Sequence, residues 1–517
     1  ERSKFDQNIP SLRWDNPWRA TDFCRAGLAG QAPGTCYDPS GYSNGNGPND
    51  GVSAMPPSNS LSTFSWMAMI KLPAKTTANA SFSAGANKQD AALIGWTTNP
   101  VVANPTVYAT FPGLASLPRQ TADLHVNYQT ATMNISSRPH KDLTLAARYR
   151  YNGRNDFRRP FDAVEYVRMD AVPEETGGES EPFTVNRNST ELSAKFTGIP
   201  SSALKVAYGE DKLEHLDRAT RGYKDKTTRV SWDTIGNQYV TLRAQYARTN
   251  RETIGFDDEI IIEMAMQPAA RFYDEAARQS DRATLMADIT PTGSLGFNLS
   301  YVYGKDDYQK GDATQKFGLM NNRNKTYTIG VSYVPNERVS LGGDFGYENW
   351  DAFQTSRTAN PFSGVPGAYE SWNDPNRDWN LTNDETVKTA TAYLNLIDVV
   401  KKTDIRATYE YSDSDQGFLH GGPRILAMQN NSILTTGDSR PCATGLTSCY
   451  TQLPNVTSTW HHFTVDLKYN ASKKVGLGLT YWYEKFNIAD WATINTAGPQ
   501  TLPRPDLGAQ TDTPRID

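Results

Sequence analysis

The chain has 517 residues, of which 38% are hydrophobic and 11% aromatic, and its mean hydropathy is −0.62. No run of about eighteen apolar residues occurs, so the sequence pattern excludes a transmembrane helix. The 52 basic and 57 acidic residues are well mixed and leave a net charge of −5, which excludes the basic footprint of a nucleic-acid-binding protein.

Pairs of roughly ten-residue runs with alternating apolar and polar side chains recur along the chain. In the third quarter of the chain, Tyr327, Ile329, Val331 and Tyr333 share one face of a predicted strand, and residues 335–338 form the turn that follows. Eight such hairpins are predicted, which gives sixteen strands. They span Ser62 to Gly85, Leu124 to Tyr151, Thr190 to Glu214, Thr227 to Arg248, Leu285 to Gly304, Tyr327 to Glu348, Glu385 to Ser412, and His462 to Phe486.

The connections between the predicted strands alternate between short and long. Residues 291–294 and 335–338 are short turns, whereas residues 87–122 and 413–459 form long polar loops. Short periplasmic turns and long extracellular loops are typical of outer-membrane barrels. The sequence therefore predicts an all-β fold, a large antiparallel transmembrane β-barrel integral to the bacterial outer membrane. A soluble β-sandwich is the alternative, but two packed sheets rarely need strands this long or this many.

The alternation also predicts how the chain is divided. Residues 1–61 are expected to form a long extracellular-side loop region, residues 62–486 the barrel, and residues 487–517 a loop-side carboxy-terminal segment. Both ends then fall on the long-loop side, whereas bacterial barrels usually keep both ends periplasmic. We therefore expect further strands, more than twenty in the full protein. The alternative is an error of one strand at each end.

The two faces of the predicted strands differ in character. Tyrosines lie at or near strand ends, as in the aromatic girdles of membrane barrels: Tyr149, Tyr151, Tyr333, Tyr409, Tyr411, Tyr469, Tyr481 and Tyr483. Polar residues on the opposite face are predicted to line the lumen and to contact a partner there. They are Arg148, Arg150, Lys195, Lys205, Arg243, Gln245, Asp344, Glu348, Arg406, Glu410, Asp466 and Lys468. Sixteen or more strands leave an aqueous channel, so water or another polypeptide could fill it.

The four cysteines form two close pairs, Cys24 with Cys36 and Cys442 with Cys449, each within a predicted loop. Two local disulfides and an oxidising compartment are the preferred interpretation. Zinc binding is the competing one, but neither pair has the two-residue spacing of a zinc site.

Reduction of both cysteine pairs is expected to loosen loops only, because neither pair spans predicted strands. Gel mobility of the heat-resistant barrel should therefore survive a reductant. Collapse of that mobility after reduction would contradict this reading of the cysteines.

The sequence lacks the common motifs of catalysis and cofactor binding. No phosphate loop, dinucleotide fingerprint, nucleophile elbow, zinc-protease motif or haem-attaching Cys-x-x-Cys-His occurs, so no enzyme activity and no catalytic residue are predicted. Asp374, Asp378, Asp384 and Glu385 form the densest acidic cluster and are weak calcium candidates, without EF-hand spacing.

Six short segments resemble the MtrB/PioB family of outer-membrane barrels. They are Met55 to Ser60, Leu143 to Arg154, Asp281 to Thr284, Tyr301 to Tyr308, Phe317 to Tyr327, and Asp374 to Trp379. Their order and spacing cover most of residues 55–412. The chain departs from the family pattern in lacking the expected terminal strands and the Cys-x-x-Cys that some members carry.

The resemblance implies a sheath around a periplasmic multihaem c-type cytochrome, a porin-cytochrome conduit for extracellular electron transfer. Haem c would then be carried by the partner and not by this chain, and an extracellular cytochrome is a further expected partner. Two other functions stay open: a solute-conducting outer-membrane porin without a cytochrome, and an outer-membrane enzyme or adhesin acting through its long loops.

Overall fold

The computed structural model describes most of the chain. The described residues are 1–9, 11–15, 50–90, 123–157, 182–216, 218–257, 269–357, 378–421, 454–472 and 474–490, with short segments within 92–95, 117–121, 161–180, 425–435 and 515–516. Cys24, Cys36, Cys442, Cys449 and Asp374 lie outside them, so the predicted disulfides and one calcium candidate stay predictions. In the described part of the chain, no helix has the length and apolar character needed to cross a membrane.

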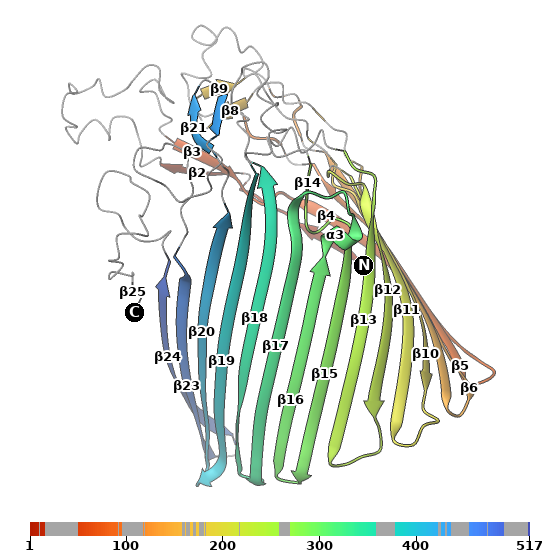
Figure 1. Cartoon of the computed structure of the whole chain (residues 1–517), viewed down its shortest axis with the longest axis vertical. Coiled ribbons are helices and arrows are strands. Elements are labelled where there is room, and N and C mark those ends of the chain that lie inside the picture. The colour runs from red at the N-terminus through yellow and green to blue at the C-terminus, as the bar shows by residue number, and fades with distance from the viewer. Residues whose placement is uncertain are drawn as a thin grey trace, which may run out of the picture.

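Sixteen long strands dominate the described structure (Figure 1). They are β4 (Asn59–Leu72), β5 (Thr76–Gln89), β6 (Leu124–His140), β7 (Leu143–Asp156), β10 (Val185–Phe196), β11 (Ser202–His215), β12 (Gly222–Thr234), β13 (Val240–Ile254), β15 (Arg278–Thr292), β16 (Leu295–Asp307), β17 (Phe317–Asn336), β18 (Val339–Arg357), β19 (Asp378–Val400), β20 (Thr403–Gly421), β23 (Val456–Ser472) and β24 (Val475–Ala489).

Shorter elements decorate this sheet. They are β1 (Arg2–Phe5), β2 (Ser11–Asp15), β3 (Asp50–Ala54), β8 (Tyr166–Arg168), β9 (Val172–Glu174), β14 (Ala270–Arg271), β21 (Ile425–Gln429), β22 (Ser432–Thr435), β25 (Arg515–Ile516) and the helical turn α3 (Tyr308–Gly311). β1 pairs with the loop end of β4, although residues 1–61 were expected to form a loop region.

Each long strand pairs antiparallel with the next one in the chain, from β4 through to β24. The eight predicted hairpins are therefore confirmed, with sixteen strands in the predicted order. Such up-and-down pairing follows from the short turns, because a turn of a few residues can only join neighbouring antiparallel strands.

The strands are longer than the predicted ten residues, and several predicted loops were too long. Residues 350–357 belong to β18, and residues 413–421 belong to β20. The strand segments nearest the long loops are polar on both faces. Lys388 of β19, for example, lies opposite Asp413 of β20. Apolar and polar residues alternate along a strand only when one of its faces is shielded from water. The alternation is therefore absent where water contacts both faces.

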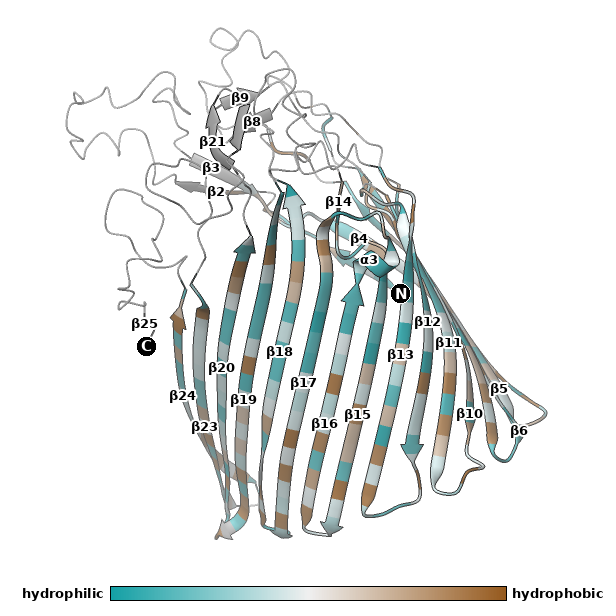
Figure 2. Cartoon of the chain, in the orientation of Figure 1, coloured by the Kyte–Doolittle hydropathy of each residue, from teal (hydrophilic) through white to brown (hydrophobic). Residues whose placement is uncertain are grey.

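One face of the sheet, here called the outer face, carries an exposed apolar band. Ile329 is 56% exposed, Leu192 56% and Leu479 64%. Figure 2 shows hydrophobic residues alternating with polar ones along the strands. A contiguous apolar belt of this size is typical of a surface that contacts lipid.

Tyrosines mark the upper limit of this band. Tyr327, whose ring centroid lies 4.9 Å from that of Tyr301, is eight residue steps from the turn residue Pro335. This separation corresponds to about 27 Å along a strand, close to the height of a lipid-facing band. Beyond the tyrosines the outer face becomes charged, with Lys226 and Glu252 paired at 2.6 Å.

Candidate functional site

The other face of the sheet is polar and concave, and we call it the inner face. By register it comprises even-numbered residues of β6, β7, β15–β18, β20, β23 and β24, and odd-numbered residues of β4, β5, β10–β13 and β19. Side chains of this face from seven neighbouring strands, β6 to β15, line one open cavity of about 720 Å³. A cavity shared by seven adjacent strands requires the sheet to curve around it.

All twelve residues predicted to line the lumen lie on the inner face. For example, Arg148 lies opposite Glu191 in the register, and Lys195 lies opposite Lys205. On the far strands, Asp344 lies opposite Thr391, which in turn lies opposite Glu410. Their role in contacting a partner stays a prediction.

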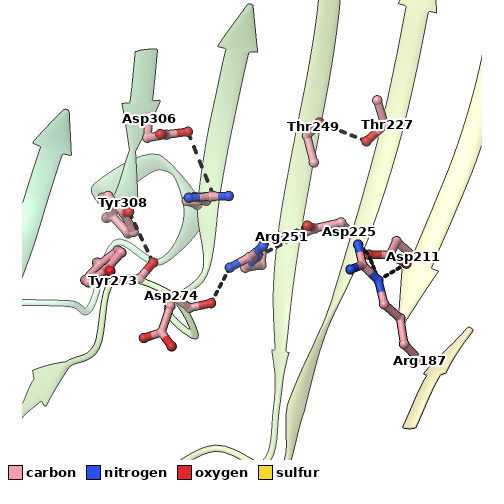
Figure 3. A network of polar contacts seen from close by, with 11 residues as sticks. Arg187, Asp211, Asp225, Thr227, Thr249, Arg251, Tyr273, Asp274, Asp306 and Tyr308 are labelled. Carbon is pink, nitrogen blue, oxygen red and sulfur yellow. Dashed lines mark hydrogen bonds and ion pairs between the residues drawn. The ribbon is translucent and has the colours of Figure 1, made fainter. Parts of the chain in front are cut away.

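Ion pairs between neighbouring strands run across the inner face (Figure 3). Arg187 of β10 pairs with Asp211 of β11 at 2.6 Å, and Arg251 of β13 pairs with Asp225 of β12 at 2.8 Å. Arg282 of β15 continues the series, at 2.8 Å from a carboxylate on β16. In each of these pairs, an arginine and a carboxylate that face the lumen neutralise each other's charge.

Several basic residues of the inner face have no such partner, and four of them lie on the adjacent strands β7, β10 and β11. Among the described residues, no ion pair involves Arg148, Arg150, Lys195 or Lys205. Arg148 lies opposite Glu191, but that carboxylate contacts Arg229 at 3.3 Å. Arg243, which was also predicted to line the lumen, pairs with Asp233 at 2.5 Å. Basic side chains available to an occupant of the lumen thus include this group on β7, β10 and β11, besides Arg406 of β20 and Lys468 of β23.

The strands β5 and β6 present mainly neutral polar groups instead. Ser81 and Thr132 hydrogen bond through their hydroxyls at 2.6 Å, and Asn134 donates to Asn79 at 3.0 Å. Such cross-strand pairs stabilise a sheet while leaving its surface uncharged and wet.

A compact cluster closes the long-loop end of β11 to β16. This rim cluster comprises His215, Arg218, Thr220, Asp274 and Glu275. Glu275 is only 1% exposed and accepts a hydrogen bond from Thr220 Oγ1 at 3.0 Å, and Arg218 pairs with Asp274 at 2.8 Å. Arg218 also contacts the Glu275 carboxylate. A buried carboxylate is tolerated only with such partners.

The loop that carries Asp274 folds inward over the sheet. It covers inner-face residues, since Arg251 is 6% exposed and Asp306 4%. Arg251 donates to the backbone oxygen of Asp274, and Tyr308 of α3 donates to the backbone oxygen of Tyr273 at 3.2 Å (Figure 3). The lumen is therefore narrowed at this end by the chain itself.

Protonation of Glu275 should control how firmly this rim is held. Burial raises the pKa of the Glu275 carboxyl above its ordinary value, although the Arg218 guanidinium opposes the shift. A raised pKa means that the folded state binds the proton more tightly, so this contribution to stability is full below the ordinary pKa and is lost as pH rises toward the folded value.

Replacement of Glu275 by glutamine should therefore protect the rim more at pH 7 than at pH 4, relative to the native chain. Hydrogen exchange of residues 269–277, corrected for intrinsic rates, measures this difference. Because His215 lies 3.9 Å from the Glu275 carboxylate, the comparison is made with His215→Asn in both proteins, so that no imidazole contributes to the difference. An equal effect of the substitution at both pH values would contradict the assignment.

The calcium candidates do not converge in the described structure. Asp378 pairs with Arg357 at 2.5 Å, Asp384 accepts from Asn349 at 3.2 Å, and Glu385 accepts from Ser414 at 2.9 Å. No group of three or more metal-ligating side chains is found in the ranges that the structure describes. With Asp374 outside those ranges, calcium binding stays a prediction.

Sequence reasoning missed the ion-pair series and the rim cluster. Asp306 lies beyond the predicted hairpin, which ends at Gly304, but in the structure it belongs to β16 and is nearly fully buried, in contact with Arg282. Alternation within one strand gives the face of a residue but not its neighbour, which depends on the register between strands.

The sequence matches one known family of outer-membrane proteins. A family model described as "outer membrane beta-barrel porin, MtrB/PioB" matches residues 1–510. No curated protein matches the chain.

Solved structures of similar shape include three outer-membrane proteins. The outer membrane transporter YddB from Escherichia coli is 8% identical, with a TM-score of 0.36 over 86% of this chain and 70% of that one. The ferric-catecholate import receptor Fiu from Escherichia coli K12 is 9% identical, with a TM-score of 0.39 over 84% and 68%. The siderophore receptor PirA from Pseudomonas aeruginosa is 10% identical, with a TM-score of 0.35 over 84% and 70%. These similarities are too low to carry an argument.

Proposed function

The chain belongs to the MtrB/PioB family of outer-membrane β-barrel porins, and we propose that its barrel encloses a periplasmic multihaem c-type cytochrome. The assembly forms a conduit that carries electrons across the outer membrane. The barrel itself is an integral outer-membrane protein and belongs to a porin family, not an enzyme family.

The observation that carries this proposal is the uncompensated charge on a wide, polar inner face. Arg148, Arg150, Lys195 and Lys205 stand without ion-pair partners among the described residues. Lys195 lies directly opposite Lys205, and like charges in that position destabilise a sheet. A polypeptide that fills the lumen with acidic side chains offsets this cost, since charged groups at interfaces are arranged with complementary sign.

Each face of the barrel has a separate task in this assembly. The outer band contacts lipid, and the inner face holds the partner away from it, so that redox groups carried by the partner are insulated from the bilayer. The chain contains no Cys-x-x-Cys-His, so haem c belongs to the partner. The inward-folded rim at Asp274 and Tyr308 limits how far the partner extends toward the long loops, where an extracellular cytochrome would dock.

A solute-conducting porin is the second candidate, and the open cavity of about 720 Å³ on the inner face favours it. Its polar lining suits hydrated solutes, and the charged groups would select among them.

A haem-stained native gel of mildly solubilised outer membranes tests the proposal, with mass spectrometry of the band that contains this chain. A co-migrating multihaem cytochrome is the expected result. A haem-free barrel that forms an open, ion-conducting pore would replace the conduit with the porin.

A further inference from the structure

Charges on the inner face are separated by sign onto two groups of strands. The first group, the basic wall, consists of β7, β10 and β11. The second group, the acidic wall, consists of β18, β19 and β20. Both counts below cover Lys, Arg, Asp and Glu of the inner face as the register places them within these described strands.

The basic wall has six basic and three acidic residues, a net charge of +3: Arg148, Arg150, Arg154, Arg187, Lys195 and Lys205 against Asp156, Glu191 and Asp211. The acidic wall has one basic and five acidic residues, a net charge of −4: Arg406 against Asp344, Glu348, Glu385, Asp404 and Glu410.

The acids of the second wall are held by weak or neutral donors. Ser414 donates to Glu385 at 2.9 Å, and Trp350 donates through Nε1 to Glu348. Glu410 contacts His462 at 2.7 Å. These partners fix the carboxylates in place without cancelling most of their charge, so the wall presents oriented negative groups to the lumen.

The two walls lie far apart along the sheet. From β10 to β19 the sheet advances by eight of its sixteen long strands (Figure 1). Between the walls on one side, β12, β13 and β15 carry charges held in ion pairs. The next strands present neutral polar groups, where Asn298 and Ser300 of β16 lie across from Gly330 and Thr328 of β17. On the other side lie the hydroxyl and amide pairs of β5 and β6.

We propose that the lumen fixes the rotational orientation of the enclosed polypeptide by charge, with an acidic face of the partner against β7, β10 and β11 and a basic face against β18, β19 and β20. This inference rests on the proposed function and adds the surface chemistry of the partner. A small solute touches one wall at a time, because a lumen of this strand number is an open channel. Only a folded polypeptide contacts both walls together. The separation of charge can therefore orient a polypeptide in the lumen but not a small solute.

The test is site-specific photo-crosslinking within the intact membrane complex. A photoreactive residue at Ser193, on the inner face of β10, and another at Thr408, on the inner face of β20, sample the two walls. Ala194, which points to the outer face, is the matched control. Partner peptides captured from position 193 should be net acidic and those from position 408 net basic, with no partner captured from position 194.

A wall exchange provides the second measurement. Reversing one wall with Arg148→Glu and Lys205→Glu should lower partner retention at least tenfold, since like-charge contacts at an interface cost several kcal/mol. Adding Asp344→Lys, Glu348→Lys and Glu410→Lys, which together make the acidic wall net basic, should restore retention and exchange the peptides captured at positions 193 and 408.

The outcomes separate the two ideas. Capture of a partner whose peptides show the same net charge at both positions would overturn the orientation but leave the sheath in place. Unchanged retention of the partner after reversal of one wall would also overturn the orientation and leave the sheath in place. Capture of no partner from either inner position would overturn the sheath, and the orientation with it.

Discussion

Replacing Ile329 with arginine should sharply reduce the amount of barrel assembled in the membrane. Ile329 is 56% exposed on the apolar band of the outer face. An arginine facing lipid costs about 2 to 4 kcal/mol at the bilayer midplane of a barrel and about 0 to 1 kcal/mol near the interfaces. Ile329 lies two residues below Tyr327, so a cost of about 1 to 2 kcal/mol is expected, which is about a 5-fold to 30-fold change in an equilibrium constant. Heat-modifiable gel mobility of the membrane fraction measures the assembled amount.

The matched control is the neighbouring substitution Thr328→Arg. Thr328 lies on the inner face, opposite Ser300, where the new side chain extends into the lumen. Assembly of this variant should match the native chain. Equal loss of assembly in both variants would show that the two faces are wrongly assigned.

Replacing Asp225 with alanine should release the inward-folded rim. Arg251 is 6% exposed and binds Asp225 through two hydrogen bonds of 2.8 Å, with its guanidinium 3.7 Å from the centroid of the Tyr223 ring. Removal of one partner from a buried ion pair leaves an uncompensated charge and costs about 3 to 5 kcal/mol. The free energy of unfolding in urea and hydrogen exchange of residues 269–277 both report this loss.

Asp211→Ala serves as the comparison, because Asp211 pairs with Arg187, whose side chain is 52% exposed. Exposed ion pairs contribute at most about 1 kcal/mol, so this variant should lose little stability and keep the rim protected. If Asp225→Ala and Asp211→Ala lower the free energy of unfolding by the same amount, the burial of Arg251 is not what holds the rim in place.

Much of the barrel follows from local alternation. The run from Tyr327 to Tyr333 predicts one lipid-facing side because every second residue is apolar, and the turn at residues 335–338 predicts the partner strand. Where both faces are wet, as at residues 413–421, the alternation disappears and the strand was interpreted as a loop.

The contacts between strands could not be predicted in this way. Asp225 and Arg251 are 26 positions apart and meet only because the register of β12 and β13 places them opposite each other. Burial of Asp306 depends further on a loop that folds inward from residues 269–277, and no repeat in the sequence signals that fold.

Conductance of the reconstituted complex tests most directly whether a polypeptide fills the lumen. Single-channel currents are recorded for the complex as isolated and again after high salt, which screens the charged walls and strips the partner. A nearly closed complex that becomes a large open pore after stripping is the predicted result. Equal currents before and after loss of the partner would place that partner outside the lumen and contradict the sheath.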